Sequence, residues 1–123
     1  MAIGLAGKGF DLDLKEGITQ ENSLANLLLE NGTIEIKSDK KTIKTGNVFV
    51  EYRQPSGPSG ISTTEAEYWA FNLIGLECII LIKTERLKKL VKKAYKEGLK
   101  ALGGDYNNYY GVLLPINWMI KND

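Results

Sequence analysis

The residues best suited to chemistry in this chain are charged side chains on alternating positions of two expected strands. Glu35, Lys37 and Asp39 have the same parity in the segment IEIKSD, so a strand places all three on one face. Glu51 and Arg53 share a face in the same way in VFVEYR. If the two strands pair as a hairpin, facing side chains come within roughly 4.5–5.5 Å of one another. Carboxylates that close repel each other unless a cation lies between them, so the pattern predicts a site for Mg²⁺ or Mn²⁺.

Histidine is absent from the chain. This excludes Ser-His-Asp and Cys-His catalysis, histidine general bases and the common zinc sites. An enzyme built from this sequence must use carboxylates, lysine, tyrosine and metals bound through oxygen. The one cysteine, Cys78, lies in the apolar run ECIILI, where we expect a buried structural thiol and not a nucleophile.

Charge is distributed unevenly along the chain. Residues 83–100 hold eight basic and two acidic side chains, a net charge of +6, which leaves −5 for the rest of a chain whose net charge is +1. A basic helix opposite an acidic cluster suits a polyanion that one element binds while carboxylates elsewhere bind metal. A lysine-rich face over a leucine stripe is also typical of an ordinary solvated helix, and that interpretation stays open.

The length of 123 residues fits one domain. No segment approaches the roughly 20 apolar residues of a membrane span, and the N-terminus lacks the apolar region of a signal peptide, so we expect a cytoplasmic protein without a membrane partner. The glycines of GLAGKGF have no preceding strand and lack the spacing of a phosphate-binding loop.

The expected order of elements is that of an α/β sheet flanked by helices. The apolar segment 77–82 is expected as a central strand buried on both faces, and Pro115 places the last strand at an edge or a bulge. In chain order, the expected elements are a helix ending at residues 31–32, hairpin strands at 33–39 and 47–53, a helix at 62–70, a strand at 77–82, a lysine-rich helix ended by residues 103–104, and a strand at 109–119.

The succession IEIKSD, KTGNVFVEY and PSGISTTEAEYW resembles small phage-type members of the PD-(D/E)XK nuclease superfamily, over roughly residues 10–70. The resemblance implies a restriction-endonuclease-like core, in which a central mixed β-sheet carries an active-site hairpin and helices flank the sheet. It also implies a metal-dependent deoxyribonuclease that hydrolyses phosphodiester bonds in phage DNA processing, recombination or repair. Little room remains for a recognition domain, so the cleavage is expected to be structure-specific or weakly sequence-specific.

The resemblance also assigns metal ligands. In that superfamily an acidic residue on one hairpin strand and the acidic residue of an E-x-K motif on the next strand bind the metal. Glu51 matches the second carboxylate, and either Asp39 or Glu35 matches the first. Glu21 resembles the additional helix carboxylate that several members contribute to the site.

The motif lysine is where this chain departs from the superfamily. Arg53 stands two residues after Glu51, and a guanidinium that stays protonated is a poor base, although it can stabilise phosphoryl charge. Lys37 can supply the ammonium from the neighbouring strand. In an alternative register, Glu35-Ile36-Lys37 is itself the E-x-K motif.

Contacts to DNA are expected from two segments. Hydroxyls before the expected helix at 62–70 lie where free backbone N–H groups favour a phosphate, although they can equally act as helix caps alone. The lysine-rich helix supplies the second set. The expected DNA-binding residues are Ser59, Thr63, Thr64, Lys88, Lys89, Lys92 and Lys93.

Other functions compete with a nuclease. The alternating charges of the first strand can form a solvated sheet edge, because cross-strand ion pairs stabilise such edges. A non-catalytic nucleic-acid-binding protein with the same fold is favoured by the arginine at position 53, and an interaction protein with an acidic partner is a third possibility. A nuclease that cuts both strands of a duplex symmetrically is expected to be a homodimer.

Overall fold

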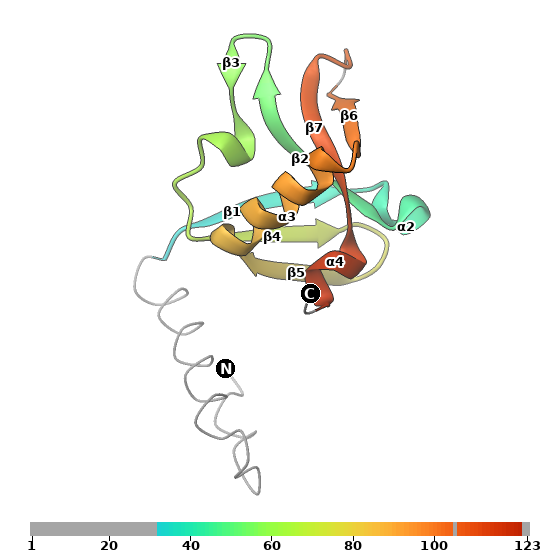
Figure 1. The fold of residues 1–123 in the computed structure, drawn as a ribbon. Coiled ribbons are helices and arrows are strands. Elements are labelled where there is room, and N and C mark those ends of the chain that lie inside the picture. The colour runs from blue at the N-terminus through green and yellow to red at the C-terminus, as the bar shows by residue number, and fades with distance from the viewer. Residues whose placement is uncertain (1–31, 105, 122–123) are drawn as a thin grey trace, which may run out of the picture. The chain divides into compact units, whose positions relative to one another are not determined.

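The computed structural model describes residues 32–104 and 106–121. The chain divides into two units, Met1–Thr33 and Ile34–Asp123, and the description below concerns the second. In its described part this unit is a mixed α/β structure with two sheets and few helices (Figure 1). The helix expected to end at residues 31–32, and Glu21 with it, lie outside the described residues.

The first sheet has the strand order β1-β4-β5. β1 (Ile34–Asp39) runs parallel to β4 (Tyr68–Leu73), and β4 is antiparallel to β5 (Cys78–Lys83). Trp69, Phe71 and Leu73 alternate along β4, and all three are almost fully buried. One face of this sheet therefore belongs to the core.

The second sheet has the strand order β3-β2-β7-β6, and all neighbouring strands are antiparallel. Its core face carries alternating aliphatic residues of β2 and β7, namely Val48, Val50, Val112 and Leu114, which have no exposed surface. The strands are β2 (Asn47–Gln54), β3 (Gly57–Pro58), β6 (Lys100–Gly103) and β7 (Tyr109–Pro115).

Helix α3 (Thr84–Lys96) packs against β4, β5 and β7 and so covers parts of both sheets (Figure 1). The predicted apolar stripe of this helix is confirmed, because Leu87, Leu90, Val91 and Ala94 are buried. The helix ends at Lys96, well before residues 103–104. Gly98, two residues after this end, adopts a positive φ of 81°. The remaining helical segments are short: α2 (Thr42–Thr45), the 3₁₀ turn η2 (Gly60–Ser62) and α4 (Ile116–Ile120).

The expected hairpin between the first two strands is wrong. β1 and β2 belong to different sheets, because β1 pairs with β4 and β2 pairs with β3 and β7. The intervening segment forms α2 instead of a tight turn. A pairing between strands distant in sequence replaced the local one, and strand alternation alone cannot specify a partner.

The expected helix at residues 62–70 is also wrong. The Ser-Thr-Thr-Glu signal follows the single turn η2, and the chain then extends into β4. The burial of alternating aromatic residues in YWAFNL determines the outcome, because that pattern has the period of a strand.

Three further expectations about β5 and β7 need correction. β5 is an edge strand, and Ile79 is 65% exposed, so the strand is not buried on both faces. Cys78 is exposed and is not a buried structural thiol. β7 lies inside its sheet between β2 and β6, and Pro115 ends it and precedes α4. Among the described residues, no helix combines the length and apolar character required to cross a bilayer.

The outer face of the second sheet depends on an aromatic ring packed over glycine. The Phe49 ring lies so close to Gly103 and Gly111 that a Cβ atom built at Gly103 would meet ring carbons at 2.7 and 2.8 Å. Such distances are shorter than ordinary contacts, so the ring fits here only because glycine has no side chain. Phe49 thereby holds β2 against β6 and β7.

We expect Gly103→Ala to lower the free energy of unfolding by about 1–3 kcal/mol, because the new methyl group overpacks the site against Phe49. Adding Phe49→Leu removes the ring, so the double variant should lose less than the sum of the two single losses. Urea unfolding of the wild type, both single variants and the double variant measures this coupling. Strictly additive losses would contradict the proposed contact.

Candidate functional site

On β1 the charged side chains, and not the isoleucines, share the sheet face that β4 turns toward the core. Its register places Lys37 beside Phe71 and Asp39 beside Leu73, on the face that β4 buries. Its isoleucines point the other way, and Ile36 is 67% exposed. Hydrophobic burial alone would favour the opposite orientation, and such a local exception is typical of a functional site.

A cleft forms where β1, β2 and β4 meet. Its volume is about 150 Å³. The cleft brings together three of the five charged residues that the sequence singled out, although their strands do not pair. The side chains that line it are Lys37, Ser38 and Asp39 from β1, Phe49 and Glu51 from β2, and Trp69 and Phe71 from β4.

The Asp39 carboxylate is held by three backbone donors. One oxygen accepts hydrogen bonds from the amides of Lys41 (2.8 Å) and Thr42 (3.1 Å), at the start of α2. The other accepts a hydrogen bond from the amide of Phe49 at 3.1 Å, which joins the end of β1 to β2. A carboxylate has about four acceptor positions, so this one keeps limited capacity for a further ligand.

The Glu51 carboxylate is held by a buried hydroxyl. Ser59 is 7% exposed, and its Oγ donates a 2.6 Å hydrogen bond to Oε2 of Glu51. The chain approaches this closely because Gly60, with a φ of 56°, has no Cβ that would collide with the Glu51 backbone. The other acceptor positions of Glu51 stay available, so this residue has more capacity for a ligand than Asp39.

Lys37 lies between an acidic and an aromatic neighbour. Its Nζ is 3.8 Å from Oε2 of Glu35 and 5.8 Å from the centre of the Trp69 ring. The Trp69 indole N–H is buried and has no hydrogen-bond partner in the described structure. An unpaired buried donor is costly, and a water or an anion oxygen would relieve that cost.

The other candidates from the hairpin prediction lie outside this cleft. Glu35 pairs with Lys37 but does not line the cavity. Arg53 is exposed and follows an irregularity in the β2–β7 register, where it stands opposite Tyr110. Both residues therefore lie near the site without forming its wall.

No α-helix begins after the predicted phosphate-binding hydroxyls, because Ser59 precedes only the single 3₁₀ turn η2, and the chain after Thr64 extends into β4. Ser59 instead binds Glu51. Thr63 is exposed, and the Thr64 hydroxyl accepts a hydrogen bond from the amide of Ala66. The helix N-terminus that would have favoured an anion is absent at this place.

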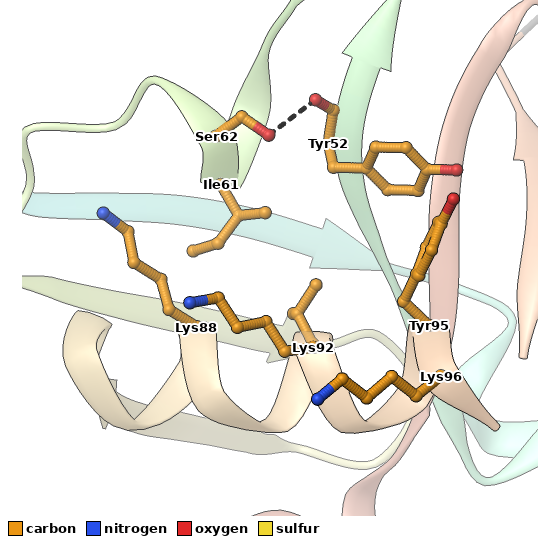
Figure 2. A pocket seen from close by; sticks show the side chains of 8 residues that line it. Tyr52, Ile61, Ser62, Lys88, Lys92, Tyr95 and Lys96 are labelled. Atoms are coloured by element: carbon orange, nitrogen blue, oxygen red, sulfur yellow. Dashed lines mark hydrogen bonds between the residues drawn. The ribbon is translucent and has the colours of Figure 1, made fainter.

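The lysines of α3 divide between two sides of the helix. Lys88 and Lys92 line a cavity of about 430 Å³ between α3 and the segment 61–62 (Figure 2). Lys93 lies elsewhere, with its Nζ 4.4 Å from the centre of the Trp118 ring. Lys89 is exposed and does not line this cavity. The four lysines that the sequence grouped together therefore do not form one surface.

Sequence reasoning missed several residues of these two cavities. Tyr95 was recoverable, because it follows Lys88 and Lys92 at helical spacing on one face of α3. The role of Ser59 gave no sequence signal, since its partner lies eight residues earlier and on another element. Trp69 and Phe71 required knowledge of the β1–β4 pairing.

The donor set can be tested against a metal ion. Within residues 32–104 and 106–121, no group of three or more Asp, Glu, Cys or His side chains is arranged to hold one ion. Asp39 and Glu51 nevertheless line one cleft, and Mg²⁺ is usually bound by one or two carboxylates and several waters. In type and number, the two carboxylates match the donors that such an ion uses.

Comparisons with known proteins give no further guide. The chain matches no family model, no curated protein and no solved structure.

We expect Ser59→Ala to lower the free energy of unfolding by about 1–3 kcal/mol, because it leaves the partly buried Glu51 carboxylate without its hydroxyl donor. Chemical denaturation measures this loss. The matched control is Ser56→Ala, an exposed serine three residues away, which should change stability by less than about 0.5 kcal/mol. Equal effects of the two substitutions would argue against a stabilising Ser59–Glu51 bond.

Proposed function

We propose that this protein is a metal-dependent DNA nuclease that hydrolyses phosphodiester bonds in the cleft between β1, β2 and β4. The observation that carries the proposal is the convergence of Lys37, Asp39 and Glu51 on one cavity from two different sheets. Two carboxylates can hold a divalent ion, and an ammonium beside them can contact an anionic phosphate. The sequence resemblance to PD-(D/E)XK nucleases points to the same chemistry.

Asp39 and Glu51 are the proposed ligands of Mg²⁺ or Mn²⁺. Asp39 is preferred to Glu35 because it lines the cleft, whereas Glu35 contacts Lys37 outside it. The bound ion would acidify a coordinated water and offset the charge that develops on the phosphate. Ser59 holds the Glu51 carboxylate, and the backbone amides hold that of Asp39, so both ligands are fixed before the ion arrives.

Lys37 is the proposed partner of the attacked phosphate. Its ammonium lies on the same strand face as Asp39, two residues away, and lines the same cleft. From there it can donate hydrogen bonds to a phosphate oxygen or orient the attacking water. Lys37 is preferred to Arg53 for this role because Arg53 does not line the cavity.

A non-catalytic nucleic-acid-binding protein is the second candidate. The observation that favours it is the triple backbone coordination of Asp39, which is sufficient to explain that carboxylate as a structural link between β1, α2 and β2. The arginine at position 53 points the same way, since the superfamily has lysine there. Such a protein would bind DNA without needing a metal ion at Glu51.

We expect Glu51→Gln to reduce metal-dependent DNA cleavage by at least about 100-fold, because even groups that only orient metal ligands contribute 10- to 100-fold. Lys37→Met should reduce it by about 10²–10³-fold, as expected for a lost charge-stabilising donor. The assay uses labelled single-stranded, duplex, flap and four-way-junction DNA with Mg²⁺, Mn²⁺ or EDTA.

The control variant for this assay is Glu65→Gln, which removes an exposed carboxylate outside the cleft and should leave cleavage unchanged. Calorimetric titration with Mn²⁺ provides a readout independent of turnover, and binding should disappear in Glu51→Gln. Cleavage at the wild-type rate by a folded Glu51→Gln protein would refute the nuclease site. Salt-sensitive DNA binding without cleavage or Mn²⁺ binding would favour the non-catalytic candidate.

A further inference from the structure

The cavity beside α3 combines cationic and aromatic side chains. Lys88, Lys92 and Lys96 recur every four residues along one side of the helix, and all three line the cavity. Tyr52 and Tyr95 stand next to one another at one end of it, as Figure 2 shows. Their rings meet edge to face, with centroids 5.6 Å apart and an interplanar angle of 86°.

A second cavity adjoins the same tyrosine pair. It has a volume of about 460 Å³ and is also lined by Tyr52 and Tyr95. Lys100, Ala101, Leu102 and Tyr110 complete its walls. The Lys100 ammonium lies 4.7 Å from the centre of the Tyr95 ring, so a cation also lies beside an aromatic ring in this cavity. The two cavities share Tyr52 and Tyr95 in their walls, and together they are here called the tyrosine groove.

The tyrosine groove is exposed where a ligand would need access. Tyr95 is 47% exposed and Tyr110 is 44% exposed, although both are large aromatic residues. Among the described residues that line the groove there is no aspartate or glutamate. Four lysines without an acidic neighbour in the wall, next to accessible aromatic rings, are complementary to a ligand that carries both phosphates and planar bases.

The Tyr52 hydroxyl, in the wall of both cavities, remains a neutral donor at physiological pH. Burial raises the pKa of the Tyr52 hydroxyl above its ordinary value, and the neighbouring Tyr95 and Tyr110 raise it further. A neutral phenol can stack on a base and donate a hydrogen bond without repelling phosphate.

The groove and the proposed catalytic cleft share β2 but open on opposite sides of it. Glu51 lines the cleft and Tyr52 lines the groove, as strand alternation requires for consecutive residues. The segment 59–62 contacts residues of both walls: Ser59 donates a hydrogen bond to Glu51 of the cleft, whereas Ser62 donates one to the Tyr52 carbonyl at 2.8 Å. A DNA ligand that reaches both the cleft and the groove must bend around β2. A single strand bends more easily than a stiff duplex.

From these observations we infer that the tyrosine groove binds a segment of single-stranded DNA, with its bases against Tyr95 and its phosphates along the lysines of α3. The inference rests on the proposed function for the identity of the ligand as DNA. The inference also narrows the expected substrate of the nuclease: the DNA must have an unpaired strand, a flap or an end near the bond that is cut.

The test measures binding of the full chain to DNA in EDTA, so that cleavage does not enter. Fluorescence anisotropy compares a labelled 15-nucleotide oligothymidylate with a duplex of the same length, from 50 to 200 mM salt. We expect tighter binding of the single strand, and a roughly 10-fold or greater loss of its affinity in Tyr95→Leu. Lys92→Gln should weaken binding and lower the salt slope by about 0.7.

The matched control is Lys89→Gln, which removes the same charge from the same helix at a position outside the groove. It should weaken binding less than Lys92→Gln does. Crosslinking of an oligonucleotide containing 5-iododeoxyuridine, followed by mass spectrometry, should identify Tyr95, Tyr52 or Tyr110 in the wild-type protein. This last readout needs no variant and holds even if Tyr95→Leu fails to fold.

Three outcomes would overturn the inference: duplex bound as tightly as single strand, crosslinks confined to residues outside the groove, or binding of poly-glutamate but of no DNA. The inference and the proposed function fail separately. Tyr95-dependent binding of single strands by a protein that never cleaves DNA would refute the proposed nuclease function and support the inferred DNA binding in the groove. Metal-dependent cleavage of blunt duplex that is unaffected by Tyr95→Leu would do the reverse.

Discussion

The Asp39 carboxylate is the link on which the candidate site depends. It ends β1, caps the first amides of α2 and accepts a hydrogen bond from Phe49 at the start of β2. Charge-assisted bonds of this kind are stronger than neutral ones and fix geometry as well as energy. Because β1 and β2 belong to different sheets, no ladder of backbone hydrogen bonds joins them. This side chain therefore sets how Glu51 approaches Lys37.

The short segment 59–62 links the cleft and the tyrosine groove through its contacts with β2. The segment 59–62 reaches β2 through Gly60, and from this one approach Ser59 holds a carboxylate while Ile61 and Ser62 wall the tyrosine groove. The packed core beneath, formed by Val48 and Val50 with α3, keeps both sides of the strand in register. A change in this short segment would therefore affect both the proposed cleavage site and the proposed strand-binding site.

Some features were predictable because they are local. The apolar stripe of α3 follows from helical periodicity, and the strands near residues 34–39 and 47–53 follow from alternation. The pairing of those strands was not predictable, since alternation is equally compatible with any partner. The helix expected at 62–70 failed for a related reason: its capping signal is worth about 1 kcal/mol, less than the burial of Trp69 and Phe71 in a strand.

The sequence by itself limited the accessible chemistry: without histidine, the chain is left with carboxylates, lysine, tyrosine and metals bound through oxygen. It also placed Lys37, Asp39 and Glu51 on strands. It also determined that one helix is strongly basic. The tertiary structure alone decided which charges meet, because the packing of β1 and β4 beside β2 brings Lys37, Asp39 and Glu51 to one cleft and leaves Glu35 and Arg53 out of its wall. It likewise brought Tyr52 against Tyr95, since contacts between distant segments follow from packing the whole core and not from any local pattern.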